Sequence, residues 1–117
     1  MAQQLKQLRD RGVLIIGSGN MVHNLRRVAW DRLDAPYAHD WAIEADTKMK
    51  QWIVEGDDQN LIDFRKQGRA FDLAIPTPEH YLPLLYTLGL KDKGEDTLLF
   101  NDQPLGGSLT MTSVKFG

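Results

Sequence analysis

The chain has 117 residues, a net charge of −2 and no cysteine. That length suffices for one domain with a hydrophobic core, and the charge provides no basic field to attract nucleic acid or an anionic membrane. The lack of cysteine excludes disulfides, thiolate metal sites and a cysteine nucleophile. No apolar stretch approaches the ~20 residues of a membrane span, and residues 1–6 lack the apolar core of a signal peptide. We therefore expect a soluble, cytoplasmic protein that binds neither nucleic acid nor membranes.

Hydrophobic periodicity and breaker residues predict helices and strands in alternation along the chain. Apolar positions at helical spacing predict helices over residues 3–11, 23–33, 40–54, 60–67 and 78–88. Continuous or alternating apolar residues predict strands over residues 13–16, 71–75, 97–100 and 109–116. Helices between strands imply an α/β fold with a mostly parallel sheet and helices on both faces, and an antiparallel ending is left open. Since the sequence has no repeat and no long linker, we expect residues 1–117 to form a single domain.

Two histidines, His23 and His80, each follow one of the first two predicted strands. Gly or Pro residues break each strand, and each histidine falls in the first turn of the helix predicted next. In an open α/β sheet, the loops at the carboxyl ends of the strands form the ligand site. We therefore predict that the two imidazoles converge on one point, as in a metal centre or an acid/base pair.

The glycine-containing turn before His23 admits a second interpretation. Its sequence Gly17-Ser18-Gly19-Asn20 suggests a nucleotide loop, but the dinucleotide fingerprint needs a third glycine where Val22 stands. A sharp turn, or a close approach of the backbone to another group, explains these glycines more simply. A small-ligand or nucleotide-binding module stays open as an alternative function.

Other polar and aromatic residues have structural explanations. His39 is expected at the surface or at a helix cap, and Glu79 is a doubtful partner for His80 because adjacent helical residues point about 100° apart. The three tryptophans, Trp30, Trp41 and Trp52, are expected in the core or at an interface.

Three segments together resemble the class III extradiol ring-cleavage dioxygenases, and in particular the DOPA 4,5-dioxygenase type. They are residues 12–25 (GVLIIGSGNMVHNL), residues 76–85 (PTPEHYLPLL) and residues 108–117 (SLTMTSVKFG). The resemblance covers nearly the whole chain but only the C-terminal part of the family domain. The family's metal site gathers further histidines from the N-terminal half, and this sequence has no counterpart to them.

The resemblance implies chemistry for both histidines. It makes His80 a ligand to Fe(II), or to Zn(II) when zinc occupies the site, and His23 either a further ligand or the acid/base that handles the catechol proton. The reaction it implies is insertion of both atoms of O₂ into a catechol such as DOPA, next to the hydroxyl pair. Zinc has no redox chemistry, so a zinc-filled site would not oxidise the substrate.

Because the resemblance covers only the C-terminal part of the family domain, it predicts an incomplete site and an incomplete fold. With two histidines of a larger ligand set, the chain is expected to be inactive alone, and a non-catalytic metal-binding module is the alternative. Part of the family's sheet would lack its covering elements, so apolar surface should be exposed. We therefore expect a homo-oligomer or a requirement for the N-terminal half, with Trp30, Trp41, Trp52 and Tyr81 as candidate contacts.

Overall fold

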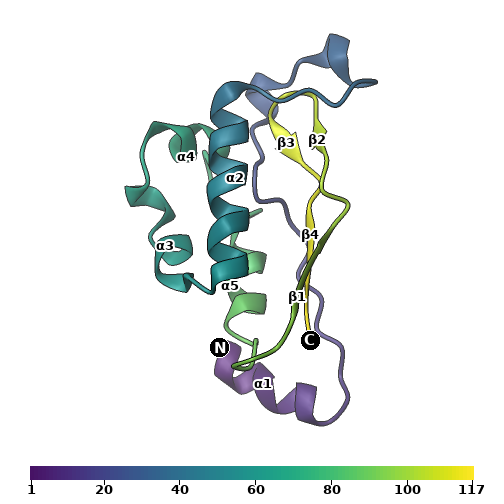
Figure 1. The fold of residues 1–117 in the computed structure, drawn as a ribbon, viewed down its shortest axis with the longest axis vertical. Coiled ribbons are helices and arrows are strands. Elements are labelled where there is room, and N and C mark those ends of the chain that lie inside the picture. Colours follow the sequence, from purple (N-terminus) through teal and green to yellow (C-terminus); the bar gives the residue numbers. More distant parts are fainter.

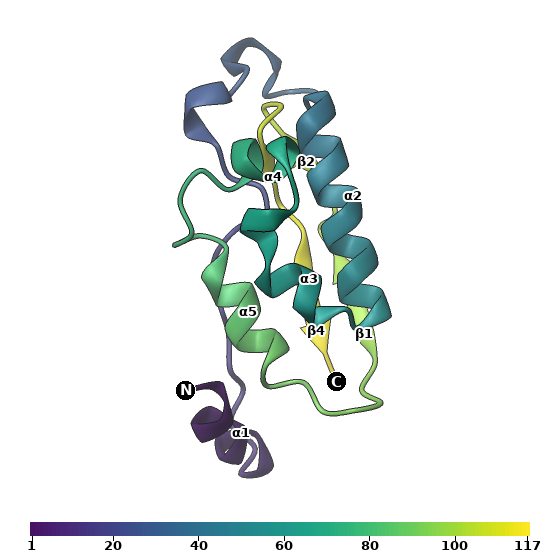
Figure 2. The same cartoon turned by 90° about the vertical axis from the view of Figure 1, so that its left-hand side faces the viewer.

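A layer of helices packs against a long, antiparallel β-ribbon in the computed structural model, which describes all of residues 1–117. The α-helices are α1 (Ala2–Asp10), α2 (Asp40–Glu55), α3 (Asp58–Ile62), α4 (Arg69–Ala74) and α5 (Leu82–Leu88). The strands are β1 (Thr97–Phe100), β2 (Pro104–Leu105), β3 (Leu109–Thr110) and β4 (Ser113–Phe116). Helices α2 to α5 lie on one side of the ribbon in both views (Figures 1 and 2), so the expected helices on both faces are not found.

The expected parallel sheet is wrong, because both pairs of strands are antiparallel. Strand β1 pairs with β4 over its whole length, from Thr97 opposite Phe116 to Phe100 opposite Ser113. The two-residue strands β2 and β3, which lie between β1 and β4 in sequence, pair with each other. The four strands follow one another closely in sequence, and short connections join antiparallel neighbours, whereas parallel strands need a long crossover. The predicted strand 97–100 is confirmed, and the predicted strand 109–116 is divided into β3 and β4.

Helix α2 is the longest element and confirms the helix predicted for residues 40–54. Its fully buried side chains include Ala45, Met49 and Ile53, which recur at the spacing of one helix face. Gly56 ends the helix in the left-handed conformation, with φ of 74°, a conformation that glycine adopts without steric cost. The helix packs on α4 and α3 and supplies the centre of the hydrophobic core. None of the helices is both long enough and apolar enough to cross a lipid bilayer.

The predicted strand at residues 71–75 is instead helical and forms α4. Its buried residues Ala70, Phe71 and Ala74 share one helix face, and the ring of Phe71 stacks on Trp52 with 5.4 Å between the ring centroids. A short apolar run has no distinguishing period, so packing against α2 decides its conformation.

The predicted helix at residues 23–33 is also wrong. Two 3₁₀ turns, Leu25–Arg27 and Trp30–Arg32, take its place. The backbone here bonds to the β2–β3 turn: the amide of Asn24 donates to Ser108 O at 3.1 Å, and the amide of Ala29 donates to Gly106 O at 2.7 Å. These bonds replace the i to i−4 bonds that a helix requires.

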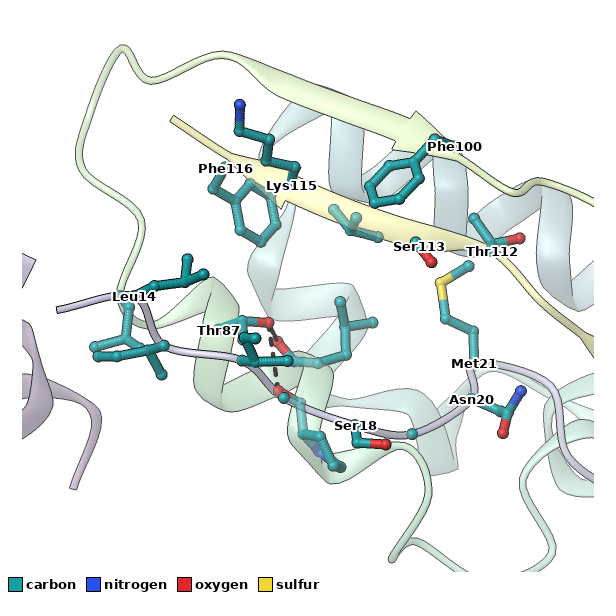
Figure 3. A pocket seen from close by; sticks show the side chains of 18 of the residues that line it. Leu14, Ser18, Asn20, Met21, Thr87, Phe100, Thr112, Ser113, Lys115 and Phe116 are labelled. Carbon is teal, nitrogen blue, oxygen red and sulfur yellow. Dashed lines mark hydrogen bonds between the residues drawn. The ribbon is translucent and has the colours of Figure 1, made fainter.

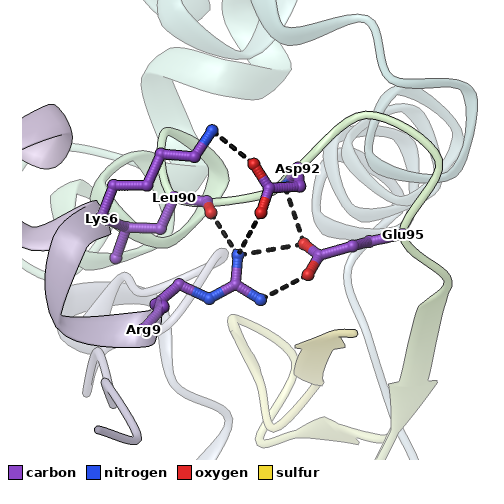
Figure 4. Close-up of polar contacts among 5 residues, drawn as sticks. All are labelled: Lys6, Arg9, Leu90, Asp92 and Glu95. Carbon is purple, nitrogen blue, oxygen red and sulfur yellow. Dashed lines mark hydrogen bonds and ion pairs between the residues drawn. The ribbon is translucent and has the colours of Figure 1, made fainter. Parts of the chain in front are cut away.

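Helix α1 confirms the helix predicted at residues 3–11, but none of its residues is buried. An ionic cluster attaches it to the loop before β1 (Figure 4). Arg9 donates to both carboxylate oxygens of Glu95 and to the carbonyl of Leu90, and Lys6 pairs with Asp92. Polar contacts rather than apolar burial therefore hold α1 in place.

Candidate functional site

His23 and His80 stack on each other, which confirms that the two imidazoles converge. Their ring centroids lie 3.8 Å apart and their planes are 19° from parallel. Neither histidine lies in the first turn of a helix: His23 forms an isolated β-bridge with Leu109, and His80 lies in the turn before α5. The sequence predicted two strand-to-helix turns as the carriers of the pair. In the structure, a β-bridge and the turn before α5 carry it instead.

Hydrogen bonds from both sides fix the segment that carries His23. The amide of His23 donates to Ala74 O at 2.8 Å, and Asn24 Nδ2 donates to Leu73 O at 2.7 Å, so both residues hold the end of α4. On the other side, the buried hydroxyl of Ser108 donates to Asn24 O at 2.7 Å. Asn24 is itself buried and fully engaged, and it joins α4 to the β2–β3 turn behind His23.

The turn that carries His80 is held by its neighbours rather than by its own side chain. Asn20 N donates to His80 O at 2.8 Å, and the adjacent Tyr81 is buried with its hydroxyl donating to Leu61 O at 2.8 Å. A Cβ atom on Gly19 would collide with the carbonyl of His80. Gly19 thus allows the close approach that brings the two histidine-bearing segments together.

The same close contact bears on the two interpretations of the Gly17–Asn20 turn, a nucleotide loop or close backbone packing. A Cβ atom on Gly17 would lie 2.9 Å from Pro83 O, so both glycines are needed where this segment crosses α5. A nucleotide loop instead directs its amides to the phosphates from the N-terminus of a following helix. No helix follows this turn directly, so the geometry favours close packing, the simpler of the two sequence interpretations.

Burial lowers the pKa of His23 below its ordinary value, and the neighbouring His80 lowers it further, because two stacked imidazolium ions would repel each other. His23 is therefore neutral near pH 7 and keeps a free nitrogen lone pair. Glu79 does not form a hydrogen bond with the pair: its carboxylate accepts the hydroxyl of Thr77 at 2.6 Å, which is the main cause of its lowered pKa. The sequence-based doubt about Glu79 as a partner agrees with this geometry.

The third histidine has a structural role. His39 Nε2 lies 2.8 Å from Arg27 O and Nδ1 lies 3.2 Å from the Tyr37 hydroxyl, while its ring stacks on Trp41. Trp41 and Trp52 pack partly buried against the core, as predicted, whereas the side chain of Trp30 is 69% exposed.

Asn24 and Ser108 position the site but are not among the residues predicted from the sequence. A signal existed for Asn24, since it is a polar residue directly after His23 and lies between the apolar Val22 and Leu25. Ser108 carried none, because a serine beside two glycines is equally typical of a solvent-exposed turn.

The pair suits a transition metal in its donor chemistry but supplies only part of a ligand set. Imidazole nitrogens are good ligands for iron and zinc, and neutral His23 has the required lone pair. A catalytic metal usually has three protein ligands, and no group of three metal-binding side chains occurs in the chain. The two histidines therefore supply at most part of the ligand set of such a metal.

Comparison with known proteins finds relatives that are longer than this chain. No protein-family model matches the chain. It is 38% identical over 120 residues to "4,5-DOPA dioxygenase extradiol" of Escherichia coli K12, which covers 100% of the chain and 43% of that protein. Proteins of the same name from Portulaca grandiflora and Beta vulgaris are 31% and 30% identical, and each match covers 99% of the chain and 42% of the relative.

A solved structure has the same fold. The crystal structure of an uncharacterized protein from Escherichia coli K12 superposes with a TM-score of 0.77 at 36% identity, covering 99% of the chain and 48% of that protein. The chain thus spans a little under half the length of the relatives that it matches.

These similarities, with the paired histidines, place the chain in the extradiol ring-cleavage dioxygenase family, of which it matches the C-terminal part. Within that family, it belongs to the DOPA 4,5-dioxygenase type.

Proposed function

We propose that this chain is the C-terminal half of an enzyme that opens the ring of catechols such as DOPA with O₂ at an Fe(II) centre. The stacked pair of His23 and His80, in a chain 38% identical to a DOPA dioxygenase, is the observation that carries the proposal. An Fe(II) ion held there would supply open coordination positions for a catecholate and O₂. Zn(II) would occupy the same site without oxidising the substrate.

The stacked geometry supports a division of the two roles between the histidines. An imidazole lone pair lies in the plane of its ring, and the two ring planes are only 19° from parallel with centroids 3.8 Å apart. In this arrangement, the two nitrogens cannot both point at one ion within a bond length of about 2 Å. One ring therefore binds the metal and its neighbour handles protons.

His80 is the metal ligand in this assignment and His23 is the acid/base. His80 is solvent-exposed at the open side of the pair, where an ion and further ligands have access. His23 is half-buried and has a lowered pKa, so it is neutral and able to accept the catechol proton near pH 7. The main-chain bond from His23 N to Ala74 O, with the bonds of Asn24, holds this imidazole in place against His80.

The test uses the chain alone and a chimera in which the unmatched N-terminal part of the Escherichia coli relative precedes Met1. Oxygen uptake with DOPA and Fe(II), and the yellow absorbance of the ring-opened product, are expected for the chimera and not for the chain. In the chimera, His80→Ala should abolish activity with loss of bound iron. His23→Gln should retain iron and lower the rate by about 10²–10⁴-fold, the usual contribution of a general acid or base.

His39→Gln is the matched control, because His39 bonds to Tyr37 and the backbone and does not touch the pair. Its activity should stay close to that of the unchanged chimera. Loss of iron in His23→Gln and not in His80→Ala would reverse the assigned roles. Full activity in both variants would refute the proposed function.

A further inference from the structure

Residues 14–19 form an extended segment whose main chain has no hydrogen-bond partner. None of their amides or carbonyls takes part in the backbone bonds of the structure, whereas the flanking Val13 and Asn20 donate to Leu8 O and His80 O. Leu14 and Ile16 on the segment are 82% and 79% exposed. An unpaired, apolar, extended segment is the kind of edge to which another strand adds.

A groove runs between this segment and the β1–β4 pair. Its volume is about 590 Å³, and Met21, Phe100, Val114 and Phe116 are among its apolar lining residues. Figure 3 shows Leu14, Ser18 and Met21 on one side of the groove and Phe100, Ser113 and Phe116 on the other. The predicted strand at residues 13–16 is therefore extended and apolar, as the sequence indicates, but it lacks the neighbour that would make it part of a sheet.

The chemistry of the groove favours a polypeptide over a small polar ligand. A strand laid along residues 14–19 would bond to the amides and carbonyls that face the groove, those of every second residue, and would cover apolar side chains on both walls. The other side of the segment is already occupied: Gly17 and Gly19 lie against α5 and the turn before it, too closely for a Cβ atom. Only the side facing the groove is open to a partner.

The lengths of the relatives indicate where this partner comes from. The solved Escherichia coli structure retains the fold of 99% of this chain, which accounts for only 48% of that protein. About half of that protein thus lies outside the match and is available as a partner, and the unpaired segment is a surface that β-strand addition suits.

We propose that residues 14–19 are the acceptor edge for an extended apolar strand from the N-terminal part of the family domain, which pairs with them and fills the groove. The proposal rests on membership of the family and not on the proposed catalytic roles. A second copy of the chain is the competing occupant, and the experiment distinguishes the two.

Hydrogen exchange read by mass spectrometry tests the pairing. In the isolated chain, the amides of residues 14–19 should exchange at near the unprotected rate, while those of α2 are protected. In the chimera with the Escherichia coli N-terminal part, the amides in this segment that face the groove should be slowed at least tenfold. Fast exchange at residues 14–19 in a chimera whose α2 amides are protected overturns the proposal.

A binding measurement tests the contribution of the groove side chains to the complex. It does not depend on folding of the chimera. The Escherichia coli N-terminal part, co-expressed as a separate polypeptide, should purify with the chain as a 1:1 complex by light scattering. Ile16→Lys should weaken this complex roughly 10–100-fold, the equivalent of one buried aliphatic side chain. Val54→Lys is the matched control, since Val54 is 61% exposed on α2, outside the groove.

Three results would overturn the proposal. They are the absence of a complex, an equal effect of Ile16→Lys and Val54→Lys, and a dimer of the chain alone in which residues 14–19 are protected. The last result would assign the edge to a second copy. None of these readouts uses ring cleavage, so an inactive chimera with protected residues 14–19 would reject the proposed function and leave this inference standing.

Discussion

Helix α2 and residues 14–19 are both apolar, yet the chain buries one and exposes the other. The α2 face formed by Ala45, Met49 and Ile53 is fully buried among α3 and α4. Leu14 and Ile16 are more than three-quarters exposed. A helix satisfies its own backbone and needs only an apolar neighbour, whereas a strand also needs a partner for every second amide and carbonyl. The chain thus contains a self-sufficient core beside an edge that depends on other polypeptide.

The largest expected effect lies in the core. Phe71→Ala should lower the free energy of unfolding by about 3–5 kcal/mol, because it removes a fully buried ring stacked on Trp52 and leaves a cavity. Ile16→Ala in the unpaired segment should change it by less than about 0.5 kcal/mol. Urea unfolding followed by circular dichroism measures both. Similar losses for the two variants would mean that residues 14–19 are buried in solution.

A smaller effect is expected at the turn that carries His80. Tyr81→Phe keeps the buried ring but leaves Leu61 O without the hydroxyl that donates to it at 2.8 Å. The expected loss is about 1–3 kcal/mol in the free energy of unfolding. The same urea titration measures it, with Tyr86→Phe on the exposed face of α5 as the control. An unchanged stability would contradict the proposed anchoring of this turn by Tyr81.

Helix α1 should respond locally rather than globally. Glu95→Gln removes the carboxylate that accepts from Arg9 at 3.0 Å, in a cluster that is partly exposed, so the change in global stability should not exceed about 1 kcal/mol. Hydrogen exchange should nevertheless accelerate in α1 and stay unchanged in α2. Glu44→Gln, which breaks only the pair of Glu44 with Lys48 on α2, should not affect α1.

The smallest expected effect is the response of α1 to acid. The hydrogen bond from Arg9 lowers the pKa of Glu95 below its usual value of 4.5. Glu95 therefore stabilises the docked helix above pH 4.5, and this contribution is lost as the pH falls through the lowered pKa. As the pH falls below 4.5, the chemical shifts of the α1 amides should move toward the shifts of the same amides in the Glu95→Gln variant. No difference between the unchanged chain and Glu95→Gln at any pH would exclude the ion pair in solution.

The sequence by itself determined the elements whose apolar pattern is long or whose chemistry is specific. The period of 3.6 residues over residues 40–54 predicted α2, and the alternation near the C-terminus predicted the last strands. The motifs around His23 and His80 predicted the family. The placement of the two histidines after two predicted strands led to the expectation that the imidazoles meet, which is confirmed although neither segment forms a strand. The metal and acid/base roles remain predictions.

Only the tertiary structure decided the conformation of the short apolar runs and the position of the site. Residues 71–74 are helical because one face of α4 packs on α2. Residues 23–33 form main-chain bonds with the β2–β3 turn in place of the predicted helix. Residues 13–16 are extended but unpaired, since pairing is a property of two segments. For the same reason, only the fold could assign to Asn24 and Ser108 the positioning of His23: their bonds join residues more than 45 positions apart along the chain.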